Sequence, residues 1–393
     1  MQRAIPTCLM RGGTSKGIFL YAKDLPPAGP LRDAVILRIF GSPDARQIDG
    51  LAGADVLTSK LAIIGPPSVP GADVDYTFGQ VSFVKPQVDY GGNCGNLSSA
   101  VGPFVIDEGI VPPPPDGQDT VTINIHNTNT GAILRATVSV SGGRVCVDGD
   151  TEIGGVPGSG ARIDLDFSAT QGSVTGALLP TGLRVEPLLV PGAEDGSGEA
   201  EELLEATLLD AGQPMVFVDA AALLGAGSGP FDVAEAAARL DADQGLLRRV
   251  ERLRGAAAVR MGIVGRWQDA ESLSPYTPFV ALVAPPPPGA AAAWDLFAVC
   301  VFMQRVHKAY AVTGSVATTA AALLPGTLPH RMARPTDGLL RIGHPSGVME
   351  VHGAVEDGSQ PKLLKAAITR TARRLMDGNA YIPWSVWPAE SKM

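Results

Sequence analysis

The chain has 393 residues, more than a usual single domain, so we expect two domains. Only 18% of its residues are charged and 5% are aromatic, whereas 47 are Gly and 33 are Pro, a composition typical of a turn-rich α+β protein. The formal net charge of −9 and the absence of clustered Lys and Arg argue against a nucleic-acid partner.

The N-terminal segment, residues 1–20, predicts a cytoplasmic protein. Arg3, Arg11 and Lys16 interrupt its apolar residues, so it offers neither a secretory core nor a membrane span. The four cysteines lie far apart and form no CxxC pair, and neither they nor the five histidines show the spacing of a zinc site. We therefore expect no metal and no disulfide framework.

Apolar periodicity and turn residues predict the elements in chain order. Strands are expected near residues 17–25, 59–65, 74–84, 120–126, 133–140, 143–147, 215–223, 260–265, 279–284, 339–342 and 348–353. Helices are expected at about 31–40, 97–108, 231–253, 294–310, 316–324 and 361–376. The segment 185–205, rich in Gly, Pro and Glu, is the best linker candidate, which divides the chain into domains 1–184 and 185–393.

The two halves resemble each other in three segments that recur in the same order. Residues 17–25 (GIFLYAKDL) match 215–223 (MVFVDAAAL), and residues 59–65 (SKLAIIG) match 260–265 (RMGIVG). Residues 92–103 (GNCGNLSSAVGP) match 313–325 (TGSVATTAAALLP), each a Gly-containing turn that opens into an apolar helix. Because these two helices lack a polar stripe, each must be buried on all sides, as the core of a surrounding sheet. We expect their Gly-rich N-termini to face one another across a cleft.

A buried helix N-terminus has unpaired N–H groups and a positive dipole end, so two of them could hold a diacid or triacid. In the first turn, glycines let the backbone approach a ligand, and Cys94 is a candidate proton donor or acceptor. The alternative is a small residue tolerated in a tight turn. The residues expected to bind substrate carboxylates at the two helix starts are Gly92, Asn93, Gly95 and Asn96, and Thr313, Gly314 and Ser315.

Lys60 alone interrupts an apolar strand. Burial favours the neutral amine, which is the form that a general base needs. The alternative is that the amine reaches solvent at a strand edge. The position matched to Lys60 in the second half holds Met261, which cannot take a proton.

Three donor-rich loops could also contact a carboxylate, although each has an ordinary loop composition. Residues 11–17 (RGGTSKG) do not have the Walker A spacing, but Thr14 and Ser15 offer hydroxyl groups. Ser346 lies in residues 343–347 (GHPSG), and the third loop spans residues 126–131 (HNTNTG). The sequence contains no Gly-x-Ser-x-Gly elbow, so a hydrolase is not indicated.

These residues also carry a family resemblance. The sequence resembles the PrpF/methylitaconate isomerase family, which includes 4-oxalomesaconate tautomerase-like proteins and has the diaminopimelate-epimerase-like fold. RGGTSKG together with GNCGN is a highly specific combination, and the matching stretches span nearly the whole chain. They are residues 9–17, 41–50, 58–63, 73–79, 92–102, 179–182, 260–263, 325–327 and 343–347.

The resemblance implies an α+β fold of two pseudo-symmetric domains, each a sheet wrapped round a central apolar helix, with the active site between them and no cofactor. It implies that Lys60 is the catalytic base, with Cys94 beside it as acid or support. In amino-acid racemases of this fold each half supplies a thiol. The second-half counterpart here is Ser315, too weak an acid or base for that task.

The sequence therefore predicts a cofactor-independent isomerase that moves an allylic proton in a small unsaturated polycarboxylic acid. Two alternatives stay open. An epimerase or racemase of an amino acid or hydroxy acid would suit the fold, and a non-enzymatic accessory protein could support an aconitase-like enzyme. We expect the small-molecule substrate to be the binding partner, and neither a membrane nor a nucleic acid. We expect the chain to form a homodimer.

Overall fold

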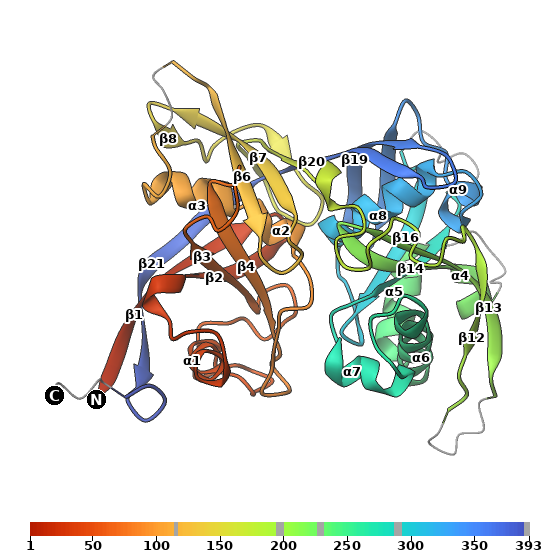
Figure 1. The fold of residues 1–393 in the computed structure, drawn as a ribbon, viewed down its shortest axis with the longest axis horizontal. Coiled ribbons are helices and arrows are strands. Elements are labelled where there is room, and N and C mark those ends of the chain that lie inside the picture. Colours follow the sequence, from red (N-terminus) through yellow and green to blue (C-terminus); the bar gives the residue numbers. More distant parts are fainter. Residues whose placement is uncertain (114–116, 194–199, 226–231, 287–292, 389–393) are drawn as a thin grey trace. The chain divides into compact units, whose positions relative to one another are not determined.

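The computed structural model describes residues 1–113, 117–193, 200–225, 232–286 and 293–388 (Figure 1). The chain forms two compact units. Unit 1 consists of Met1–Glu152, Val156–Leu165 and Arg370–Met393, and unit 2 of Ile153–Gly155 and Asp166–Thr369, in each case as far as described. None of the described helices combines the length and the apolar character needed to cross a bilayer.

Unit 1 is built on a mixed sheet whose strands β21, β1, β2, β3, β4, β6 and β7 are successive neighbours. The strands are β1 (Gln2–Gly12), β2 (Ser15–Tyr21), β3 (Lys60–Gly65), β4 (Val74–Val81), β5 (Val88–Asp89), β6 (Thr120–Asn127), β7 (Ile133–Ser141), β8 (Arg144–Val145), β9 (Thr151–Glu152), β10 (Ser159–Gly160), β11 (Ile163–Asp166) and β21 (Ala372–Pro383). The helices are η1 (Ala22–Asp24), α1 (Pro30–Phe40), α2 (Gly95–Ser98) and α3 (Val101–Asp107).

Unit 2 has a corresponding sheet in which β12, β13, β14, β15, β16, β18, β19 and β20 follow one another. The strands are β12 (Glu186–Val190), β13 (Glu202–Ala211), β14 (Gln213–Asp219), β15 (Phe279–Ala284), β16 (Leu296–Phe302), β17 (Arg305–Val306), β18 (Leu339–His344), β19 (Gly347–Glu356) and β20 (Lys362–Arg370). The helices are η2 (Ser168–Thr170), α4 (Ala220–Leu224), α5 (Val233–Ala242), α6 (Gln244–Arg260), η3 (Trp267–Asp269), α7 (Ala270–Leu273), α8 (Val312–Leu323) and α9 (Leu328–Met332).

The pairing directions repeat from one unit to the other. Along β1, β2, β3, β4, β6 and β7 they are antiparallel, parallel, antiparallel, parallel and antiparallel. The same order holds along β13, β14, β15, β16, β18 and β19. In each unit a short hairpin strand, β5 or β17, precedes the apolar helix. The internal repeat is therefore present in the hydrogen-bonded topology itself.

Each sheet buries an apolar helix, as the sequence predicts. Every residue from Val312 to Ala322 of α8 is buried in unit 2. In unit 1 the sheet is covered on both faces: Val35, Ile36 and Phe40 of α1 pack with one face, while α3 covers the other. There Phe104 lies 5.2 Å from Phe19, ring centroid to ring centroid. Because both faces are covered, polar side chains at the centre of this sheet, such as those of Lys60 and Gln80, are buried.

Two predicted helices are wrong, because both segments form strands. Residues 294–310, which include the hairpin strands β16 and β17, have a continuous apolar run that suits a buried helix and a buried strand equally. Met303 and Gln304, with φ of 48° and 56°, make the reversing turn. Residues 361–376 form β20 and the start of β21. The predicted helix 231–253 begins outside the described residues and is divided at Asp243, which ends α5 and caps α6.

The second repeat match is also wrong. Residues 260–265 are not a strand but the end of α6 and the turn after it, where Gly262 has the left-handed φ of 73° that stops a helix. The topological counterpart of β3 is β15. The sequence-based division at residue 184 assigns β21 to the second half, whereas β21 pairs along β1 in unit 1. Part of the expected linker, residues 194–199, lies outside the described residues, and its flanks form β12 and β13.

Candidate active site

One row of side chains in unit 1 points from the sheet toward α2. Gly17 of β2 pairs with Lys60 of β3, and Lys60 pairs with Gln80 of β4. Paired residues on neighbouring strands share a face of the sheet. A Cβ on Gly17 would lie 2.6 Å from Leu97 Cδ1 of α2, so this row faces the buried helix. The Lys60 side chain therefore starts on the covered face and not at a solvated edge.

The Lys60 amine is buried, with only 2% of the residue exposed. Its Nζ donates to Gln80 Oε1 at 3.0 Å and lies 5.4 Å from the centroid of the Phe78 ring. Gln80 Nε2 donates in turn to the carbonyl oxygens of Ser59 and Val56, at 3.1 and 3.2 Å. These two bonds orient the amide so that its oxygen faces the amine. The loop before β3 thus fixes the position of Lys60 through Gln80.

Cys94 caps the N-terminus of α2 and is 6% exposed. Its Sγ accepts a hydrogen bond from the Leu97 N–H at 3.5 Å and lies 3.9 Å from Ser15 Oγ. Ser15 and Gly17 are alternate residues of β2, so they share a face and lie about 7 Å apart along the strand. The thiol therefore lies beside the same row of residues as the Lys60 amine, with Ser15 next to it.

Tyr76 and Gln80 belong to this environment but were missed in the sequence. Tyr76 is fully buried, and its burial, together with the nearby Cys94, raises the pKa of its phenol well above the usual value. Gln80 could have been noticed as a polar residue near the end of an apolar strand. Its role, however, depends on the register between β3 and β4, which no local pattern predicts.

The turn between β1 and β2 lies against α2. Asn96 Oδ1 accepts from the Thr14 N–H at 3.3 Å, and a Cβ on Gly13 would lie only 2.1 Å from that oxygen. Glycine at position 13, with φ of 51°, permits this approach. The predicted residues Thr14, Ser15, Cys94 and Asn96 are thus brought together. The remaining predicted residues of this turn are close by in the chain, namely Gly92, Asn93 and Gly95.

The predicted residues of unit 2 occupy different positions from those expected. Helix α8 begins at Val312, with Ala311 as its N-cap, so Thr313, Gly314 and Ser315 lie inside its first turn. Ser315 Oγ donates to the Val312 carbonyl oxygen at 2.8 Å. By helix start, the counterpart of Cys94 is Ala311, and the sequence match to Ser315 is not supported.

Ser346 lies in the exposed turn between β18 and β19, outside the helix starts. Its hydroxyl donates to the Lys308 carbonyl oxygen, and its N–H donates to His344 Nδ1 at 3.2 Å. The first bond joins this turn to the loop between β17 and α8, and the second lies within the turn. The structure thus places Ser346 in unit 2 without relating it to Lys60.

The counterpart of Lys60 in unit 2 is an aromatic residue. Phe279 begins β15 and pairs with Met215, as Lys60 begins β3 and pairs with Gly17. The neighbouring ring is Phe302 of β16, 5.1 Å away between centroids. The expected counterpart, Met261, is wrong because it lies at the end of α6. An amine and an amide in one repeat thus correspond to two aromatic rings in the other.

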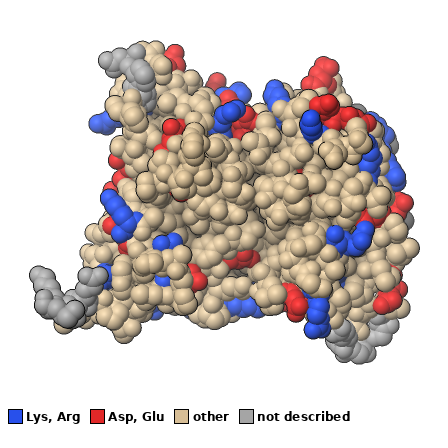
Figure 2. Space-filling model, in the orientation of Figure 1, with Lys and Arg blue, Asp and Glu red and all other residues tan. Residues whose placement is uncertain are grey.

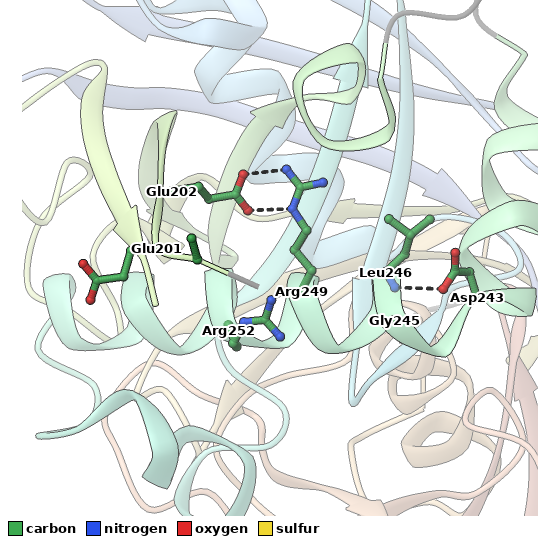
Figure 3. Close-up of a pocket in the computed structure, with 8 residues that line it drawn as sticks. Glu201, Glu202, Asp243, Gly245, Leu246, Arg249 and Arg252 are labelled. Carbon is green, nitrogen blue, oxygen red and sulfur yellow. Dashed lines mark hydrogen bonds and ion pairs between the residues drawn. The ribbon is translucent and has the colours of Figure 1, made fainter. Parts of the chain in front are cut away.

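Unit 2 contains a cavity of about 560 Å³ near the N-terminus of α6, shown in Figure 3. Arg249 and Glu202 form a two-point ion pair in its wall, with both N–O distances 2.6 Å, and Asp243 accepts from the Leu246 N–H. Arg252 Nε donates to the Pro191 carbonyl oxygen at 2.9 Å. Because these charged groups are bonded to the wall itself, we do not assign the reaction to this cavity.

The visible molecular face in Figure 2 carries Lys and Arg interspersed with Asp and Glu, separated by wide uncharged areas. Among the described residues, no group of three or more His, Cys, Asp or Glu side chains is arranged to hold a metal ion. Near α2 the described structure brings the Cys94 thiol next to the Ser15 hydroxyl, and the strand that carries Ser15 pairs with the strand that begins at Lys60.

The repeated sheet and buried helix define the class of fold. A crystal structure of a hydroxyproline epimerase from Agrobacterium vitis has a TM-score of 0.53 over 99% of both chains, at 12% identity, and so shows the fold alone. The chain has the diaminopimelate-epimerase-like α+β fold, as the sequence predicted.

The family model described as PrpF protein matches residues 2–383, and the chain belongs to that family. It is 44% identical to 3-methylitaconate isomerase of Eubacterium barkeri, over 97% of this chain and 98% of the relative. It is 37% identical to 4-oxalomesaconate tautomerase of Pseudomonas putida, over 100% and 99%. The crystal structure of a methylitaconate-delta-isomerase has a TM-score of 0.75 at 41% identity, over 99% of this chain and 98% of that one. The chain is an isomerase.

Proposed function

We propose that this isomerase moves a proton across the allylic three-carbon unit of an unsaturated di- or tricarboxylic acid without a cofactor. The relatives named for methylitaconate and oxalomesaconate support this substrate class. We further propose that 4-oxalomesaconate, methylaconitate, aconitate and methylitaconate form the set to test, because they share the same reacting unit. A homodimer remains a prediction of the sequence.

The proposal is supported by the burial of the Lys60 amine and by the Cys94–Ser15 contact, because Ser15 shares a sheet face with Gly17, the residue paired with Lys60. In the proposed reaction, neutral Lys60 takes the proton from a carbon next to the double bond. The electron pair of that C–H bond enters the conjugated system and forms a dienolate. Lys60, now an ammonium, or Cys94 then gives a proton to the far carbon; in the second case the ammonium passes its proton to the Cys94 thiolate, which restores both groups. The double bond has moved and no redox change has occurred.

Hydrogen-bond donors near the base are proposed to hold the carboxylates and stabilise the dienolate, which is usually the largest catalytic contribution. In unit 1 these are the residues that line the turn before α2. They are Thr14, Ser15, Gly92, Asn93, Gly95 and Asn96. The corresponding residues of unit 2, which stay predictions, are Thr313, Gly314, Ser315 and Ser346.

An epimerase that uses a proton-transfer group from each repeat is less well supported. The N-cap of α8 is Ala311, and the counterpart of Lys60 is Phe279, neither of which can exchange a proton. A single amine that removes and returns the proton on one substrate needs no such second group.

The test is a Lys60→Met variant assayed by proton NMR against the four acids. Methionine has a similar length but takes no proton, so we expect kcat to fall by about 10²- to 10⁴-fold on the acid that the unaltered enzyme isomerises. The matched control is Lys85→Met, which removes an exposed amine from the same unit and should leave kcat unchanged. Near-normal turnover by Lys60→Met would contradict the proposal.

A further inference from the structure

A buried cation lies outside the group of residues described so far. Arg370 is only 4% exposed and is the last residue of β20, two residues before β21 begins. Burial lowers the pKa of its guanidinium from the ordinary value to about 9. The group is still protonated at neutral pH. Arg370 therefore carries a positive charge inside the protein.

The backbone next to Arg370 is bound to the turn between β1 and β2. The Gly13 N–H donates to the Thr371 carbonyl oxygen at 2.9 Å, and Ala372 pairs with Gly12. Arg11 Nη1 donates to the same carbonyl oxygen at 3.0 Å and to Thr371 Oγ1 at 3.1 Å. These bonds fix the start of the Arg370 side chain relative to the turn.

The Arg370 side chain runs to the corner where this turn meets α2. A Cβ on Gly13 would lie 3.2 Å from Arg370 Cδ and 2.1 Å from Asn96 Oδ1. The next residue, Thr14, has a buried hydroxyl oxygen without a hydrogen-bond partner among the described residues. Ser15 follows and contacts Cys94. The buried charge of Arg370 and the Thr14 hydroxyl therefore lie at one corner. Thr14 immediately precedes Ser15, the residue that contacts Cys94.

We propose that Arg370 binds a non-reacting carboxylate of the substrate, with the Thr14 hydroxyl donating a second hydrogen bond to it. A guanidinium matches a carboxylate with two parallel N–H bonds, and such a pair strengthens away from water. This inference rests on the proposed function, because it assigns one carboxylate of that substrate class to a site in unit 1.

The experiment compares Arg370→Gln, Arg370→Lys and Thr14→Val with an Arg373→Gln control, which changes an exposed arginine near the start of the following strand, β21. We expect the Arg370→Gln change to raise KM about 10- to 100-fold, because it removes a charged hydrogen-bond donor from the carboxylate. The KM of Arg370→Lys should lie between those of the unaltered enzyme and Arg370→Gln, because lysine keeps the charge but lacks the two parallel N–H groups of the guanidinium. Thr14→Val, which leaves Arg370 intact, should raise KM about 3- to 10-fold. The control should leave KM unchanged.

Binding of tricarballylate, a saturated tricarboxylate that cannot isomerise, is measured in parallel by calorimetry. Weaker binding to both Arg370→Gln and Thr14→Val, with far-UV circular dichroism unchanged, would support the carboxylate site even if the unaltered enzyme isomerised none of the four acids. In that case only the proposed function would fail. An unaltered enzyme that isomerises an acid, combined with unchanged KM and tricarballylate affinity in both variants, would overturn the Arg370 inference alone. If the unaltered enzyme neither isomerised an acid nor bound tricarballylate, both would fail.

Discussion

Lys60 and Gln80 form a buried, hydrogen-bonded pair on the sheet face that lies against α2. Gln80 offers an uncharged acceptor at 3.0 Å, which holds the amine without adding a negative charge. A carboxylate at the same place would favour the ammonium, a form that cannot act as a base. The amide thus holds the Lys60 amine in place through an uncharged hydrogen bond.

The Gln80→Glu variant tests this role. The new carboxylate should hold Lys60 protonated, so we expect kcat near neutral pH to fall at least about 10-fold and the active limb of the pH profile to move to higher pH. Gln80→Leu, which removes the acceptor without adding charge, is the matched comparison. It should lower kcat without the shift along the pH axis. An unchanged pH profile in Gln80→Glu would show that residue 80 does not influence the group that acts as the base.

Cys94 combines a capping position with a reactive group. Serine is a better N-cap than cysteine, so Cys94→Ser should keep or raise the thermal midpoint while it removes the thiol. We expect kcat to fall about 10- to 100-fold, less than in Lys60→Met, because the thiol assists the amine. Thermal unfolding and steady-state kinetics on one sample measure both effects. Unaltered turnover would leave the thiol with a structural role only.

The sequence was most informative about these residues when each stood out locally. Lys60 interrupts an apolar strand and Cys94 begins an apolar helix, so both could be predicted. Gln80 is placed by strand register, and Arg370 by the return of β21 to β1 from the far end of the chain. Neither relation is encoded in a short window of sequence.

Strands and helices were predicted well where the apolar residues followed only one of the two periods, two residues for a strand or 3.6 residues for a helix. The strands near residues 120–126, 133–140 and 279–284 and the helix near 31–40 are confirmed. Residues 294–310 failed because a run buried on every side has no polar face to reveal its period. Residues 260–265 failed because the short apolar run before Gly265 resembles a strand, whereas Gly262, with its left-handed φ, ends helix α6 inside that run.

Strand β2 packs closely on helix α2, so a larger residue at the contact should destabilise the protein. A Cβ on Gly17 would lie 2.6 Å from Leu97 Cδ1 and 3.0 Å from the Lys60 carbonyl oxygen, so Gly17→Ala should displace α2 or β3. We expect a loss of about 1–3 kcal/mol in the free energy of unfolding by urea, together with lower kcat. Gly358→Ala, where a Cβ meets nothing within 4 Å, is the control. Equal stability of the two variants would contradict the packing described.

In the whole molecule, two units share one topology but differ in chemistry. The first repeat places an amine and an amide where the second places Phe279 and Phe302. Matched substitutions should therefore act differently. Lys60→Met should lower the free energy of unfolding by only about 1–2 kcal/mol, because methionine has a similar length and the change removes one hydrogen bond, that to Gln80 Oε1. Phe279→Ala should cost about 3–5 kcal/mol, because it leaves a cavity. Urea unfolding monitored by circular dichroism measures both.

The central claim is that Lys60 moves an allylic proton that can exchange with solvent. It is tested most directly by following each acid in heavy water by proton NMR, with the unaltered enzyme and with Lys60→Met. We expect the unaltered enzyme to introduce deuterium at the allylic carbons as isomerisation proceeds, and Lys60→Met to introduce none at the same enzyme concentration. Deuterium incorporation by Lys60→Met at the normal rate would contradict it.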